Sequence, residues 1–96
     1  MRVSFNTPAL ADLREIFSYI AADDKNAAIM LIGRICEAVI RIGECPGIGQ
    51  WTEGGKLKKL PIGNYSLFYE VKTEEIIIHH IRHGARLPPR EDPERD

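Results

Sequence analysis

The stretch LKKLPIGNYSLFYEV, residues 57–71, decides how the chain folds. Apolar and polar side chains largely alternate on both sides of Gly63-Asn64, which is the pattern of a β-strand with one buried face. A Gly-Asn pair between two such runs is typical of a two-residue hairpin turn. Pro61 has no N–H to donate, so we expect it at a sheet edge or at a bulge. The stretch therefore predicts two antiparallel strands.

Two more strands are expected, one on each side of this hairpin in the sequence. RVSFN (residues 2–6) alternates and is short. IIIHHIRH (residues 76–83) opens with three β-branched residues after the turn KTEE, and such residues favour a strand. The segment CPGIGQWTEGG (residues 45–55) is expected to be a loop, because it is rich in Gly and Pro.

Two amphipathic helices lie between the first strand and the hairpin. Thr7 is a candidate cap and Pro8 suits the first turn of a helix. A second helix is expected from about Ala27 to Glu44 with Asn26 as its cap. The linker between them is short, which predicts an antiparallel helical hairpin. The expected class is α+β, in the order β-α-α-β-β-β, with the helical hairpin packed on a small antiparallel sheet. The apolar stripes are Leu10, Leu13, Ile16, Phe17 and Ile20 in the first helix, and Ala28, Leu31, Ile32, Ile35, Val39 and Ile42 in the second.

The second helix has more apolar residues than one buried face requires. Ile29, Met30, Cys36 and Ile40 widen its stripe. The helix is therefore either wrapped by neighbours or offers a second apolar surface to a partner. Cys36 is interpreted as a small core residue. Neither Cys36 nor Cys45 belongs to a C-x-x-C pair, so we expect no zinc site. We expect no disulfide either, because the chain has only two cysteines and a reducing compartment is expected.

The charge distribution divides the chain into three parts. Residues 1–55 carry five basic and seven acidic side chains, residues 56–90 seven and three, and residues 91–96 one and four. We expect one domain over residues 1–90 and an acidic, loosely held tail over residues 91–96. No apolar run approaches membrane-spanning length and the first ten residues do not resemble a signal peptide, so a cytoplasmic protein is expected.

The three histidines lie within five residues, His79 to His83. On a regular strand the side chains of His79 and His80 point to opposite faces, and His79 and His83 lie ~13 Å apart on one face. These positions cannot share one metal ion, so we expect no metal and no cofactor. The chain also lacks the G-x-S-x-G and phosphate-loop motifs.

The basic residues near the C-terminal strands leave two interpretations open. If the sheet brings their strands together, one end of it is positive and could contact an anionic partner. Alternatively, they are a solvated edge protected by lysines. The residues concerned are Lys58, Lys59, Arg82, His83 and Arg86.

Several segments in order resemble the RelE/ParE superfamily of toxins from bacterial toxin–antitoxin pairs. TPALADLREIFSYIAADDKNAA resembles its first helix and the following turn. IGECPGIGQ resembles the helix exit, KLKKLPIGNYSLFYEV the hairpin, and IIIHHIRHGAR the closing strand. The resemblance covers residues 2 to 86, and its most specific part is the ending His-Gly-Ala-Arg at residues 83–86. It implies a cognate antitoxin as partner in a hetero-oligomer, with Ile29, Met30 and Ile40 as candidate antitoxin contacts.

Two branches of the superfamily are compatible with these residues. RelE-like members are ribosome-dependent mRNA endonucleases, which typically place a functional Tyr or His beyond the last strand. The tail LPPREDPERD has neither. ParE-like members inhibit DNA gyrase by binding, and the ending His-Gly-Ala-Arg is closer to them. The resemblance therefore implies a gyrase-binding toxin that is not an enzyme, with Arg82, His83, Arg86, Lys58 and Lys59 as target contacts. The alternatives are a RelE-like ribonuclease, for which His83 is the candidate proton carrier, and a degenerate non-toxic member that still binds antitoxin.

Overall fold

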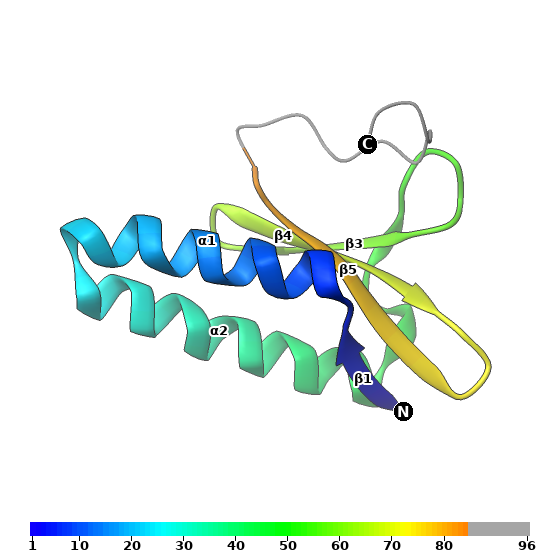
Figure 1. Cartoon of the computed structure of the whole chain (residues 1–96). Helices are drawn as coiled ribbons and strands as arrows, with labels where there is room; N and C mark the ends of the chain where they lie inside the picture. The colour runs from blue at the N-terminus through cyan, green and yellow to red at the C-terminus, as the bar shows by residue number, and fades with distance from the viewer. Residues whose placement is uncertain (85–96) are drawn as a thin grey trace.

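A helical hairpin covers one face of a five-stranded sheet in the computed structural model, which describes residues 1–84 (Figure 1). The predicted α+β class and the predicted order of elements are confirmed, with one short strand added. The elements are β1 (Arg2–Phe5), α1 (Thr7–Asp23), α2 (Lys25–Glu44), the 3-10 turn η1 (Pro46–Ile48), β2 (Gln50–Trp51), β3 (Lys58–Ile62), β4 (Tyr65–Val71) and β5 (Glu75–His83).

The sheet is mixed, where a purely antiparallel one was expected. Its strand order is β1-β5-β4-β3-β2. β1 runs parallel to β5, pairing Arg2 with Glu75 and Phe5 with Ile78, and the other neighbours are antiparallel. Parallel neighbours need a long connection, and the helices and strands between β1 and β5 provide one. The added strand β2 has only two residues, too few to show a period in the sequence.

The predicted hairpin is confirmed in detail. Ile62 pairs with Tyr65 across Gly63-Asn64, and Gly63 has φ 59°, as the first position of a type II′ turn requires. Pro61 lies beyond the end of β2, where β3 is the edge of the sheet. Its missing N–H therefore costs no ladder bond to another strand.

Asn6 and Asp24 cap the helices, so the predicted caps Thr7 and Asn26 are wrong by one and two residues. Asn6 Oδ1 accepts from the N–H of Ala9 at 2.9 Å, and Asp24 Oδ1 accepts from the N–H of Ala27 at 3.1 Å. A capping oxygen must reach an N–H two or three residues further on, and these two side chains do so from extended backbone. Asp24 is also the single residue that separates α1 from α2.

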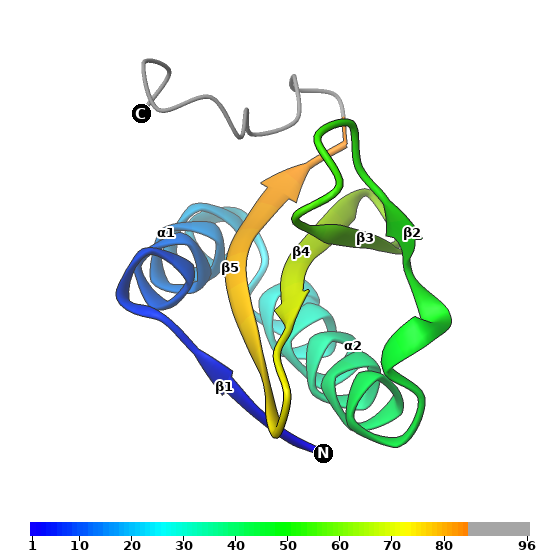
Figure 2. The same cartoon turned by 90° about the vertical axis from the view of Figure 1, so that its right-hand side faces the viewer.

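The core lies between the helices and the sheet, where α1 packs against β5 and α2 against β1 and β3 (Figure 2). Two expectations about it are wrong. Leu10 is exposed, whereas Ala9 beside it is buried, and Cys36 is exposed, because it lies on the side of α2 away from the sheet. The core residues are Ala9, Leu31, Ile35, Ala38, Ile42, Leu60, Ile62, Leu67, Tyr69, Ile76, Ile78 and Ile81.

Tyr69 ties the loop after α2 to the centre of the sheet. Its hydroxyl donates to the carbonyl of Pro46 at 2.8 Å and accepts from the N–H of Gly49 at 2.9 Å. Burial raises the pKa of Tyr69 above its ordinary value of 10.0, although the bond from Gly49 acts in the opposite direction. The phenol therefore stays neutral and holds η1 against β4.

Candidate functional site

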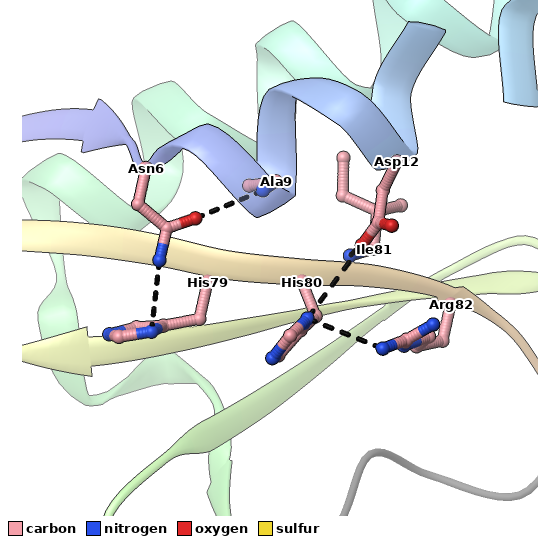
Figure 3. Close-up of polar contacts among 7 residues, drawn as sticks. All are labelled: Asn6, Ala9, Asp12, His79, His80, Ile81 and Arg82. Atoms are coloured by element: carbon pink, nitrogen blue, oxygen red, sulfur yellow. Dashed lines mark hydrogen bonds and ion pairs between the residues drawn. The ribbon is translucent and has the colours of Figure 1, made fainter. Parts of the chain in front are cut away.

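A β-bulge at His79 sets the direction of the histidine side chains. Phe68 of β4 pairs with His80 and Tyr69 pairs with Ile78, so His79 has no residue opposite it. The prediction that His79 and His80 diverge is therefore wrong. Both side chains lie on the same side of β5, with ring centroids 6.4 Å apart (Figure 3). An extra residue in one strand reverses the faces beyond it, which single-strand alternation cannot anticipate.

His79 is held between the start of α1 and strand β4. Because Asn6 uses its oxygen to cap α1, its Nδ2 faces Nδ1 of His79, at 3.1 Å, and donates to it (Figure 3). Nε2 of His79 lies 2.9 Å from Oε1 of Glu70. Nδ1 accepts, so neutral His79 carries its proton on Nε2 and donates it to Glu70. His79 thus has a structural role in joining three elements.

His80 lies between a carboxylate and a guanidinium. Oδ2 of Asp12 is 3.8 Å from Nδ1 of His80, and Nη2 of Arg82 is 3.4 Å from the same nitrogen. Asp12 also accepts from the backbone N–H of Ile81 at 3.0 Å. β1 ends opposite Ile78, so the Asp12 carboxylate takes the place of a strand at this part of the β5 edge. These contacts fix the orientation of His80 and Arg82 relative to α1.

The sheet face away from the helices carries two cations of the predicted set, Lys59 and Arg82. Lys59, Phe68 and His80 lie in one row across β3, β4 and β5, and Arg82 lies in the adjoining row beside Ser66. Within residues 1–84, Arg82 forms no ion pair with a carboxylate, and its buried Nε has no hydrogen-bond partner. A buried polar group of a charged side chain without a partner is unusual, which marks Arg82 as a candidate contact residue. We call Lys59, His80 and Arg82 the outer-face cluster.

The other predicted contact residues lie elsewhere. Lys58 points to the opposite face from Lys59, with Nζ 4.3 Å above the ring centroid of Trp51 and a bond to the carbonyl of Gly49. The ring of His83 packs edge-on against Tyr65 at 5.0 Å. Arg86 and the predicted tail, residues 91–96, lie outside the described residues. Of the four predicted contacts that the structure describes, two, Lys59 and Arg82, therefore lie on one face of the sheet.

A groove of about 380 Å³ lies where α1 passes the end of β5. Its wall from α1 includes the carboxylates of Asp12 and Glu15, and its wall from the sheet includes the rings of Tyr65 and His83. The full lining is Asp12, Glu15, Ile16, Tyr19, Tyr65, Ile81, Arg82 and His83.

The second apolar surface expected on α2 is present. Ile29, Met30 and Ile40 are 53%, 69% and 60% exposed. Of the two interpretations of the widened stripe, the structure of residues 1–84 therefore favours a surface open to a partner.

Two classes of site are not found in the part of the chain that the structure describes. No group of three or more His, Cys, Asp or Glu side chains there could hold a metal ion. No helix there is long and apolar enough to cross a membrane.

The sequence matches the family model of the ParE toxin of the type II toxin–antitoxin system parDE over residues 3–88. The chain belongs to the ParE toxin family. This match spans nearly everything from β1 to the end of β5 and confirms the resemblance inferred from the segments of the sequence. No match is found among curated proteins.

The fold of this ParE-family chain also occurs in a solved structure, the chromosomal ParDE TA system from P. aeruginosa. The match has a TM-score of 0.77 and 24% identity, and covers 86% of this chain and 95% of that one. At this identity the likeness establishes the shared fold.

Sequence reasoning missed Asp12, which orients His80, and Asn6 and Glu70, which hold His79. Asp12 looks like an ordinary polar residue on the solvent side of an amphipathic helix. Because β1 ends opposite Ile78, the backbone of β5 beyond that point is open to Asp12. The bulge turns His79 towards Asn6 and Glu70. Both features arise from pairing between distant segments, so no local pattern in this ParE-family sequence signals them.

Proposed function

We propose that this ParE-family chain is a toxin that binds DNA gyrase and inhibits it in the cytoplasm, and that a cognate antitoxin neutralises it. Membership of the ParE toxin family over residues 3–88 is the observation that carries this proposal. The name of the structural neighbour, a ParDE TA system, supports pairing with an antitoxin. We expect inhibition by binding, without covalent chemistry on the target.

The proposed target contact is centred on Arg82. Its guanidinium is oriented by His80, and it has donors available because it forms no ion pair within residues 1–84. Lys59 lies on the same face, two strands away. The two cations suit an acidic surface of gyrase or the phosphates of DNA bound to it. His83, Lys58 and Arg86 stay proposed contacts, although Lys58 points to the other face of the sheet and Arg86 lies outside the described residues.

The proposed antitoxin contact is the exposed apolar surface of α2, with Ile29, Met30 and Ile40 as its candidate residues. Exposed apolar side chains gathered on one helix are characteristic of a docking surface for another protein. An apolar face of the antitoxin that covers them would remove them from water, which gives the complex its driving force. We expect the complex to be a hetero-oligomer.

The proposal is tested by expressing the chain without antitoxin and measuring gyrase cleavage complexes and mRNA integrity in the same culture. We expect growth arrest, gyrase cleavage complexes on DNA and intact mRNA. Arg82→Gln should relieve the arrest, because it removes the charge at the centre of the contact surface. Arg14→Gln, which removes an exposed charge from α1, is the matched control and should stay toxic. Normal gyrase activity in arrested cells would contradict the proposal.

A second candidate is the RelE-like ribosome-dependent ribonuclease. It is supported by the position of His80, which has the Asp12 carboxylate on one side and the Arg82 guanidinium on the other. An imidazole oriented by a carboxylate can move a proton during attack on a phosphate, and neighbouring cations can stabilise the charge that develops. Cleaved mRNA with unbroken DNA in the same culture would favour this candidate and make His80→Ala the decisive variant.

A further inference from the structure

The exposed side of α2 carries a regular row of apolar and small residues. Ile29, Gly33, Cys36 and Ile40 follow one another at intervals of four, three and four residues, and all four are exposed. In a helix with 3.6 residues per turn this spacing places them on one side. That side faces away from the core, and no other helix or strand of the described chain covers it in Figures 1 and 2. We call these four residues the α2 stripe.

The spacing of the α2 stripe is that of a helix-pairing seam. Intervals of four and three are the a and d positions of a heptad, along which two helices pack side by side. The stripe spans eleven residue steps, about 16 Å of helix. This length is three turns, which suits a reversible contact of modest affinity.

The stripe is also complementary to itself. Its centre lies between residues 34 and 35, from which Ile29 and Ile40 are equally distant, as are Gly33 and Cys36. If two copies pack antiparallel about a two-fold axis, Ile29 of one meets Ile40 of the other, and each Cys36 faces a Gly33. A Cβ at Gly33 would meet no atom within 4 Å, so the backbone there is open to close approach by the facing side chain. A two-fold axis requires this kind of symmetry of a surface.

The charges at the ends of α2 fit the same arrangement. Lys25 and Glu44, its first and last residues, are again equally distant from the centre of the stripe. Antiparallel packing therefore places Lys25 of each copy level with Glu44 of the other. A parallel pair would instead place like charges level with each other, which is unfavourable.

We propose that, when no other protein covers α2, two copies of this chain pair antiparallel through the α2 stripe. The pairing does not depend on gyrase as the target. It does use Ile29 and Ile40, which are also proposed antitoxin contacts, so a copy paired in this way cannot bind antitoxin through them. Self-association and neutralisation would then compete.

The oligomeric state of the chain, made by cell-free synthesis without antitoxin, tests the proposal. Sedimentation equilibrium from low to high micromolar concentration should show a reversible monomer–dimer equilibrium. Ile40→Glu should raise the dissociation constant at least about tenfold, because it places two carboxylates in the seam. Tyr19→Glu puts the same charge at an exposed position of α1 and should leave the constant unchanged. Circular dichroism verifies that both variants fold.

Charge reversal tests the antiparallel arrangement. Lys25→Glu should weaken the dimer, and adding Glu44→Lys in the same chain should restore it. Both changes suit the α2 termini, since acidic residues favour the start of a helix and basic residues its end. A chain that stays monomeric at all concentrations, or a dimer that Ile40→Glu leaves intact, would overturn the proposal. A double variant as weak as the single one would overturn the antiparallel arrangement.

Discussion

Asn6 serves two structures at once. Its oxygen caps α1 and its amide nitrogen donates to Nδ1 of His79, so one side chain fixes both the start of the helix and the tautomer of the ring. Because an amide has one acceptor end and one donor end, neither role can be exchanged with the other. The bulge at His79 is thereby connected to the helical layer.

Asn6→Asp should separate the two roles. Aspartate caps a helix as well as asparagine does, so stability should stay close to that of the parent chain, whereas Asn6→Ala should lose about 1–2 kcal/mol. The carboxylate cannot donate to His79, and we expect Nδ1 of His79 to gain a proton instead. ¹⁵N NMR of the ring measures this directly. A parent chain whose His79 already carries a proton on Nδ1 would contradict the assignment.

Tyr69 should make stability depend on pH at the alkaline end. Burial raises its pKa above 10.0 in the folded chain, so folding favours the neutral phenol. The corresponding stabilisation is complete below pH 10 and is lost as the pH rises through the folded-state pKa. Urea unfolding of the parent chain and of Tyr69→Phe is compared at neutral pH and above pH 10. The free energy of unfolding should fall with pH more steeply in the parent than in Tyr69→Phe. An equal fall in both chains would contradict this role of Tyr69.

Among the elements, the loop after α2 has the strictest steric requirement. A Cβ on Gly49 would lie 2.7 Å from the Tyr69 hydroxyl and 2.9 Å from the carbonyl of Lys59, whereas one on Gly47 would meet nothing within 4 Å. Gly49→Ala should therefore cost about 1–3 kcal/mol, and Gly47→Ala should stay within about 0.5 kcal/mol. Chemical denaturation of the two variants measures this difference. Equal losses would mean that the loop adapts freely.

The elements also show what a sequence can predict. The hairpin at Gly63-Asn64 and the two helices were predictable, because turn residues and side-chain periodicity are local signals. The parallel pairing of β1, the bulge at His79 and the contact of Asp12 with β5 were not, because each depends on how distant segments meet. The bulge at His79 decides which side chains of β5 lie on the sheet face away from the helices. The sequence therefore identified Arg82 and Lys59 as candidates without showing that the ring of His80 contacts the guanidinium of Arg82.

For the molecule as a whole, the fold separates two surfaces. The outer-face cluster lies on the sheet face away from the helices, and the α2 stripe lies on the side of α2 away from the sheet. A target on the first and a protein partner on the second could be bound without direct contact between them. An antitoxin bound to α2 would then neutralise the toxin by steric hindrance of the target, or through a second segment that covers the outer-face cluster.

The most direct test of the central claim uses purified gyrase and supercoiled DNA with the chain made without antitoxin. We predict that the parent chain and Arg14→Gln inhibit supercoiling and trap cleaved DNA, and that Arg82→Gln inhibits at least about tenfold less, because it loses a charge-assisted contact. Gyrase that stays fully active at a large excess of folded parent chain would contradict the account.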